Sequence, residues 1–263
     1  MRFSFGKNWQ GYSRAALSPA RIEQGRQALG DLLRDVPVAK KNFLDIGFGQ
    51  GLTAHLAHQM GAKVMGVDID NDNLLAAKNT QQKMGVKENL DLRIGSVLDQ
   101  NLISELRKTT QWHVVHSWGV LHHTGNMDLA VKNATSLVAK DGFFVCAIYN
   151  RHWSSLPWLW IKWFYNILPN VGQQLMIAMF YPIIFLAKWI VTGQNPKAMT
   201  RGMDFFYDVV DWVGGYPYEY ASLGEFKALV EPLGFKCIKE LTANVPTGCN
   251  EFVFQRINKR KIV

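Results

Sequence analysis

Residues Phe43 to Gly51 read FLDIGFGQG, and this stretch decides the fold class. A short apolar run carries one acid, Asp45, and leads into glycine at alternate positions, Gly47, Gly49 and Gly51, before a helix-like stretch. This order is typical of a buried strand, a glycine-rich turn and a helix. Glycine adopts backbone angles that other residues avoid and lets a ligand approach the main chain, so the turn favours a nucleotide-like ligand. A tight turn without any ligand is the alternative.

A second strand pattern strengthens the ligand interpretation. Residues 63–70 read KVMGVDID, an apolar run that ends at Asp68 and Ile69. An acid at the tip of the strand beside the glycine turn can accept both hydroxyls of a ribose. The alternative role for Asp68 is the N-cap of the following helix. Asp70 or Asn71 is better placed for that cap, which leaves Asp68 for the ligand.

FLDIGFGQG followed by VMGVDID resembles the cofactor-binding half of the class I S-adenosylmethionine-dependent methyltransferases. The resemblance implies a Rossmann-like α/β fold with a seven-stranded, mostly parallel sheet and an antiparallel last strand. It implies S-adenosylmethionine as cofactor and S-adenosylhomocysteine as product. This chain departs from the family at Phe48, where a small residue is usual. Further stretches (FSFGKNW, SWGVLHHTG, IYN, RGMDFFYDVVDWVGGYPYEY and GCNEFVF) resemble a bacterial group loosely similar to the ubiquinone-pathway methylases, over nearly the whole chain.

The resemblance also assigns the cofactor-binding residues. Ser96 stands where the family usually has an acid that contacts the adenine, and we expect it to do so together with the Val97 backbone. Ser117 and Trp118 are expected at the methionine end, and Trp9 in an arm over the cofactor. The full expected set is Trp9, Asp45, Gly47, Gly49, Gly51, Asp68, Ile69, Ser96, Val97, Ser117 and Trp118.

The chain divides into four segments. We expect an N-terminal arm over 1–41, the cofactor-binding core over 42–150, an apolar helical insertion over 151–200, and a substrate loop with the end of the core over 201–263. Alternating patterns predict strands near 43–47, 63–68, 90–95, 112–118, 142–149, 235–241 and 249–256, and helices near 21–33, 50–60, 71–84, 127–139 and 223–232. In the arm, FSFGKNW is either a lid over the cofactor or an aromatic anchor, and the resemblance favours the lid.

The insertion is the unusual part of the sequence. Residues 153–191 hold five of the nine tryptophans, no acid, and two charges, Lys162 and Lys188. Its second half, 175–191, contains Pro182 and is only marginally long enough to span a bilayer. Three interpretations remain open: an apolar cap on the core or on a second subunit of a homodimer, an element at a membrane surface, and a single span. Tryptophan together with lysine is typical of a membrane surface.

The candidate catalytic residues are His123, Asp208, Asp211 and Tyr216. Histidine titrates near neutrality, so His123 can act as a base or can simply pack in a loop. Residues 201–222 mix acids, aromatics and glycines, which favours a substrate pocket over a plain connector. Either acid can take a proton from the acceptor, and Tyr216 can orient it. No histidine or cysteine spacing indicates a metal site.

Composition limits the partners and the compartment. The 263 residues carry a formal charge of +8, which favours acidic partners such as anionic lipid, a phosphorylated substrate or nucleic acid. The densest basic cluster is the tail at 259–261, which a solvated terminus explains equally well. Three cysteines without a CxxC pair and an N-terminus without a signal-peptide core predict a cytoplasmic protein, with peripheral contact at the inner membrane face as an option.

These observations predict a methyltransferase that acts by in-line transfer on a small molecule with an apolar, lipid or aromatic part. Two alternatives are kept. An RNA methyltransferase is suggested by the charge, but SWGV stands where base-amino methylases carry a proline-rich tetrad, so nucleic acid is disfavoured. A binding protein that holds the cofactor without turnover is the other alternative.

Overall fold

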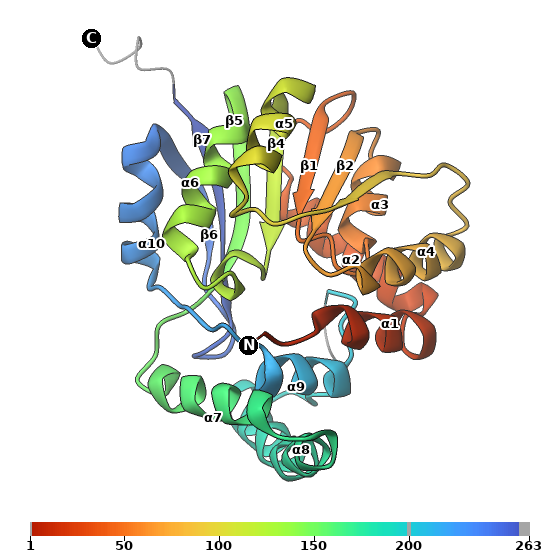
Figure 1. The fold of residues 1–263 in the computed structure, drawn as a ribbon, viewed down its shortest axis with the longest axis vertical. Coiled ribbons are helices and arrows are strands. Elements are labelled where there is room, and N and C mark those ends of the chain that lie inside the picture. Colours follow the sequence, from red (N-terminus) through yellow and green to blue (C-terminus); the bar gives the residue numbers. More distant parts are fainter. Residues whose placement is uncertain (1, 199–200, 258–263) are drawn as a thin grey trace.

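A seven-stranded sheet in the order β3-β2-β1-β4-β5-β7-β6 forms the centre of the molecule (Figure 1). The computed structural model describes residues 2–198 and 201–257. All strand pairs from β3 to β5 are parallel, and β7 runs antiparallel to both β5 and β6. This confirms the expected sheet. The strands are β1 Asn42–Ile46, β2 Lys63–Asp68, β3 Asp91–Ile94, β4 Trp112–Trp118, β5 Val138–Tyr149, β6 Phe235–Leu241 and β7 Cys249–Arg256.

Helices cover both faces of this sheet because neighbouring residues of its central strands point to opposite sides. Phe43 packs with α2 and α3, whereas Leu44 packs with α5, α6 and α10. The helices are α1 Phe5–Ala15, α2 Pro19–Leu32, α3 Leu52–Gln59, α4 Asp72–Met84, α5 Gln100–Thr109, α6 Met127–Leu137, α7 Ser155–Ile167, α8 Asn170–Thr192, α9 Phe205–Gly214 and α10 Leu223–Val230. Short 3₁₀ turns lie at Leu121–His123 and Glu231–Leu233.

Three helices were not predicted from the sequence. Residues 5–15 were expected only as part of the arm, yet they form α1. Residues 100–109 were not predicted as helix, yet they form α5, which begins where Asp99 accepts a hydrogen bond from the Asn101 amide at 2.8 Å. The expected substrate loop contains helix α9. Asp204 caps it by accepting from the amides of Phe206 and Tyr207.

Helices α7, α8 and α9 form a separate apolar layer at one end of the sheet (Figure 1). Its centre is formed by the buried side chains of Phe205, Val209 and Val213, spaced four apart on α9, with Tyr165 of α7 and Ile177 of α8. Within the described ranges, α8 is the helix that is long and apolar enough to cross a membrane by length and composition, with a mean hydropathy of 1.9. Only 6% of its most apolar window is buried.

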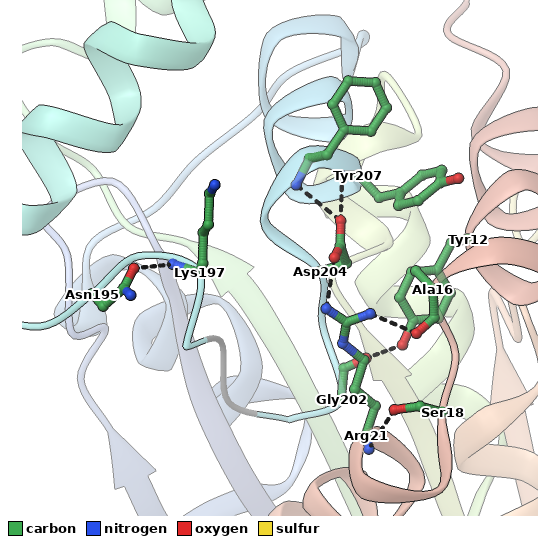
Figure 2. Close-up of polar contacts among 10 residues, drawn as sticks. Tyr12, Ala16, Ser18, Arg21, Asn195, Lys197, Gly202, Asp204 and Tyr207 are labelled. Atoms are coloured by element: carbon green, nitrogen blue, oxygen red, sulfur yellow. Dashed lines mark hydrogen bonds and ion pairs between the residues drawn. The ribbon is translucent and has the colours of Figure 1, made fainter.

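The arm is joined to this layer by a polar cluster (Figure 2). Arg21, in the first turn of α2, donates to the Ala16 carbonyl at the end of α1 and pairs with Asp204 at 2.6 Å. Tyr12, fully buried, donates its hydroxyl to the Gly202 carbonyl. Burial raises the pKa of Tyr12 to about 12, so the hydroxyl stays protonated and remains a donor. The N-terminal arm, with its helices α1 and α2, is therefore anchored on the segment that leads into α9.

Candidate active site

A cavity of about 1570 Å³ lies at the carboxyl ends of the parallel strands. Its walls come from the glycine turn after β1, from α1, from the inner side of α8, from α9 and from the 241–249 loop. Pockets for one small ligand usually measure 300–1,000 Å³. This cavity is therefore large enough for two ligands side by side.

The glycines of the turn are required by their backbone angles and by side chains that pack closely against them. Gly47 and Gly49 have φ angles of 75° and 52°, which favour glycine. A Cβ on Gly47 would lie 2.3 Å from Val120, so no larger residue fits there. Phe48, the unusual residue of the turn, is buried against Gly66 of β2, where the missing side chain leaves room for its ring.

Asp68 lies at the end of β2, beside this turn. One carboxylate oxygen accepts from the Gly49 amide at 2.9 Å, and the other from the Asp70 amide at 2.8 Å. Burial raises the pKa of Asp68, while the two backbone hydrogen bonds and a hydrogen bond with the Asn73 side chain oppose the rise. Asp70 accepts from the Asp72 amide at the start of α4, so the helix is capped without Asp68. A carboxylate has about four lone-pair sites, so Asp68 keeps the capacity to accept from a ligand hydroxyl.

Asp45 has a partner that the sequence did not indicate. It faces His116 across the β1–β4 pair, and its Oδ1 lies 2.7 Å from Nδ1 of that histidine. Both side chains are buried, and among the described residues Oδ2 of Asp45 has no hydrogen-bond partner. Both residues line the cavity. A buried polar atom without a partner at a cavity wall indicates a place for a ligand donor.

The other expected cofactor residues separate into two groups. Those that line the cavity are Trp9, Ile69, Ser96, Val97 and Trp118, together with the residues already described. Two do not line it. Ser117 is fully buried and donates to the Ile46 carbonyl, so it fastens β4 to β1 instead. Gly51 caps α3, where a Cβ would lie 2.9 Å from Ala77, so its role is helix packing.

The residues present fit the cofactor expected from the sequence. Gly49 leaves the main chain open beneath the Trp9 indole, whose Nε1 would lie 3.3 Å from an added Cβ. Ser96 accepts from the Leu98 amide through its hydroxyl oxygen and keeps the hydroxyl proton for a ligand. The buried indole Nε1 of Trp118 has no acceptor among the described residues. Donors and acceptors thus lie along one wall of the cavity.

Two acids of α9 line the other end of the cavity. Asp208 pairs with Lys188 of α8 at 3.3 Å. Asp211 accepts a hydrogen bond of 2.6 Å from the Asn8 amide of α1. Burial raises the pKa of Asp211 to about 8, although the Asn8 hydrogen bond and the Lys162 charge act in the opposite direction. Asp211 can therefore exchange a proton near neutral pH.

Lys162 has a fully buried amine. The sequence indicated it only as one of the two charges of the apolar insertion. Its Nζ donates to the Trp212 carbonyl and lies 4.4 Å from the ring centre of Trp212 and 4.8 Å from that of Tyr218. Burial lowers the pKa of Lys162 to about 7, and the charge of Asp211 opposes the change. The amine joins α7 to α9 directly behind the acids.

His123 lines the cavity, but its environment makes it a weak base. The side chain is buried, and its Nδ1 lies 2.6 Å from the Pro217 carbonyl, so this nitrogen carries the proton. Burial, followed by the Lys162 charge, lowers the pKa of His123 to about 3. Tyr216 does not line the cavity; its carbonyl accepts from the Phe3 amide. Within the described ranges, no group of histidine, cysteine or acidic residues is arranged to hold a metal.

Residues missed by the sequence analysis share a feature. His116, Lys162 and Asn8 are polar residues near apolar or aromatic ones. His116 and Asn8 each hydrogen-bond to a predicted acid of another element, and Lys162 interacts electrostatically with one. His116 had a readable signal, because it occupies the same level of β4 as Asp45 does on β1. The other two depend on how α1 and α7 pack against α9, which no local pattern specifies.

Comparison with known proteins places this geometry in a family. Residues 19–182, more than half of the chain, match the family model described as "Methyltransferase domain". A ubiquinone biosynthesis O-methyltransferase of Pelagibacter ubique is 26% identical over 117 residues, which are 44% of this chain and 45% of that protein. The chain thus matches less than half the length of this curated relative.

Solved structures share the fold at low identity. A SAM-dependent methyltransferase from Anabaena variabilis superimposes with a TM-score of 0.58 at 14% identity, covering 98% of both chains. The magnesium protoporphyrin IX methyltransferase of Synechocystis, with bound SAH, superimposes with a TM-score of 0.55 at 13% identity, covering 90% of this chain and 83% of that one.

Proposed function

The chain belongs to the family of S-adenosylmethionine-dependent methyltransferases, and we propose that it methylates a small molecule with an apolar, lipid or aromatic part. One observation carries the choice of acceptor. The cavity that begins at the glycine turn continues without interruption to apolar side chains of the insertion, Trp158, Ile184 and Val191. An acceptor bound there would have an apolar body against α8 and its reactive atom toward the cofactor end.

The cofactor end supplies positioning. Asp68 and the glycine turn would hold the ribose side, Ser96 and Val97 the adenine, and Trp118 the methionine side. When bound, S-adenosylmethionine supplies an electrophilic methyl group on its sulfonium sulfur. Phe5 and Trp9 of the arm line the cavity and reduce its contact with water. Holding two reactants in line at near-contact distance contributes roughly 7–11 kcal/mol to such reactions.

A proton acceptor is needed only if the acceptor atom carries a proton that must leave. Asp211 suits this task better than His123, because a pKa of about 8 lies near the working range and a pKa of about 3 does not. Asp208 has its charge partly compensated by Lys188. We therefore assign the base to Asp211 within this proposal.

A labelling experiment tests the proposal. Wild-type protein and an Asp68→Ala variant are incubated with methyl-labelled S-adenosylmethionine and cell extract, and the products are divided into organic, aqueous, protein and nucleic-acid fractions. We expect label in the organic fraction that requires Asp68. Label confined to the nucleic-acid fraction would support the RNA alternative, and no Asp68-dependent label in any fraction would support a cofactor-binding protein without turnover.

A further inference from the structure

The outer side of the α7–α8 hairpin exposes an unusual amount of apolar surface. Of the 22 large hydrophobic residues that the described chain exposes, 14 lie between residues 153 and 191. Together they expose on the order of 1,000 Å², given that a large aromatic side chain buries 150–250 Å² when fully covered. Soluble monomers rarely expose patches of more than about 300–600 Å². This surface, which we call the outer stripe, therefore indicates a partner.

The outer stripe follows helical geometry on both helices. On α8 the exposed residues recur at intervals of three or four, so they share one face of the helix. They are Val171, Leu175, Met179, Ile183, Leu186 and Ile190. On α7 the exposed face is formed by Leu156, Trp160, Trp163, Phe164 and Ile167. The opposite faces pack against α9. Both helices are thus apolar on the side that has no protein against it.

We infer that the outer stripe docks on the surface of an anionic lipid bilayer. Residues 150–203 contain no acid, and their bases include Arg151 before α7, which pairs with Glu225 at 2.7 Å, and Lys197 after α8, both exposed. Bases beside an apolar face suit anionic headgroups above an acyl layer. Four tryptophans of the stripe are exposed, with Trp153 at 82% exposure, and indole rings favour the boundary between headgroups and acyl chains.

A second copy of this chain fits the outer stripe less well. A two-fold dimer presents the same patch on both subunits. Such an interface would bring two segments with no acid of their own together, because Glu225 and Asp208, which pair with Arg151 and Lys188, lie outside residues 150–203. The headgroups of anionic lipids carry the opposite charge and would attract the bases of the segment.

The hairpin lies along the membrane plane in this inference rather than crossing it. The chain enters α7 from β5 and leaves α8 toward α9, so both ends of the hairpin return to the protein. Lys188 near the end of α8 pairs with Asp208 of α9, which holds this end against the core. An amphipathic helix that lies with one face on protein and the other at the acyl boundary is compatible with both of these observations.

The inference deepens the proposed function, on which its last step rests. Ile184 and Ala187 of α8 line the cavity, while Ile183, Leu186 and Ile190 of the same turns belong to the outer stripe. One helix, roughly 10 Å across, would then separate the bilayer from the acceptor end of the cavity. An acceptor with a lipid part would reach the cavity from the bilayer with little transfer through water.

Vesicle flotation tests the docking. The probes are vesicles of phosphatidylcholine alone and of phosphatidylcholine mixed with phosphatidylglycerol. The variant replaces Leu175, Ile183 and Ile190 with glutamine, and the matched control replaces Leu75, Ile94 and Ile238, which are exposed by 41%, 42% and 41% and lie outside the cavity wall. We expect wild type and control to float with the mixed vesicles, with a blue shift of tryptophan fluorescence. The outer-stripe variant should partition at least tenfold less.

The outcomes separate the docking from the proposed function. Calorimetric binding of S-adenosylhomocysteine without vesicles shows that each variant is folded, and it does not depend on lipid. Absence of flotation for wild type, or equal flotation of wild type and outer-stripe variant, would overturn the docking even if the labelling experiment succeeds. A wild-type dimer that the outer-stripe variant converts to monomer, with no flotation of either, would also overturn it and assign the surface to a second copy.

Discussion

Asp211 and Lys162 are a buried acid and a buried amine, with pKa values of about 8 and about 7. Burial favours the uncharged form of each group, so it acts in opposite directions on an acid and on an amine. Each also lowers this cost for the other through opposite charge. The pair therefore holds a proton that can be exchanged near neutral pH, at the wall where the acceptor would bind.

This arrangement predicts the pH dependence of the reaction with a protonated acceptor. Asp211 accepts a proton only when ionised, so kcat/KM should rise with pH up to about 8 and then level off. Asp211→Asn should remove this rise and lower kcat/KM by roughly 10²–10⁴-fold. Asp208→Asn is the control and should keep the rise. A rise centred near pH 3 instead would assign the base to His123.

Lys162 makes a separate prediction for stability. Its folded pKa of about 7 lies below the ordinary 10.5, so its contribution to stability is complete above pH 10.5 and is lost as the pH falls toward 7. Lys162→Met removes the buried amine but keeps the length of the side chain. We expect unfolding by urea at pH 7 to show equal or greater stability for this variant, by up to about 4 kcal/mol.

The gain from Lys162→Met should shrink when the same titration is done near pH 10. Lys162→Ala is the matched variant and should be destabilised, because it leaves a cavity among the rings of Trp212, Tyr218 and Tyr149. Loss of stability of the Met variant by several kcal/mol at both pH values would mean that the ring contacts outweigh the burial cost.

At the scale of elements, the strand-turn-helix pattern was readable and the contacts between distant segments were not. The last two strands were predicted with the bounds that the structure has, 235–241 and 249–256, because Gly234 precedes the first of them and Pro246 and Gly248 lie between them. Helix α9 was missed, although Asp204 before an apolar spacing of four is a start signal. Its glycines and aromatics were interpreted as a loop. The packing of α1 on α4 and α9 depends on contacts between residues about 60 and 200 positions apart.

A matched pair of glycine substitutions tests the docking of the arm. A Cβ at Gly6 in α1 would lie 2.6 Å from the Asp70 carboxyl carbon, whereas Gly30 in α2 has nothing within 4 Å. Gly6→Ala should displace α1 from α4, move Trp9 from the cavity and speed the release of S-adenosylhomocysteine several-fold. Gly30→Ala should leave release unchanged and stabilise the fold by roughly 0.5–1 kcal/mol.

Stopped-flow tryptophan fluorescence measures the rate at which the two glycine variants release S-adenosylhomocysteine. Thermal unfolding measures their stability. Equal release rates for Gly6→Ala and wild type would show that α1 does not retain the cofactor, and Trp9 would then be only an anchor of the arm.

At the scale of the molecule, the apolar interior consists of three clusters. Two lie on the faces of the sheet, and the third lies among α7, α8 and α9. Elements with fewer buried contacts open at lower free energy than the global unfolding of the protein. Backbone amides of α7 and α8 should therefore exchange with solvent faster than those of β4 and β5, as hydrogen–deuterium exchange with mass spectrometry can measure.

Anionic vesicles should slow the exchange of α7 and α8 and leave that of the sheet unchanged. S-adenosylhomocysteine should slow exchange in α1 and in the turn after β1. If α7 and α8 exchange as slowly as β4 in the absence of lipid, the hairpin is part of the same cooperative unit as the sheet, and the division into clusters has no energetic meaning.

The separation of the third cluster from the sheet has a consequence for how this chain can change over generations. Substitutions in α7 and α8 would alter the proposed acceptor end of the cavity, while Asp68, the glycine turn and the sheet clusters would keep their neighbours. Selection can therefore act on the acceptor without a loss of cofactor affinity, and a laboratory library confined to 153–191 should yield new acceptor preferences at a high proportion of folded clones.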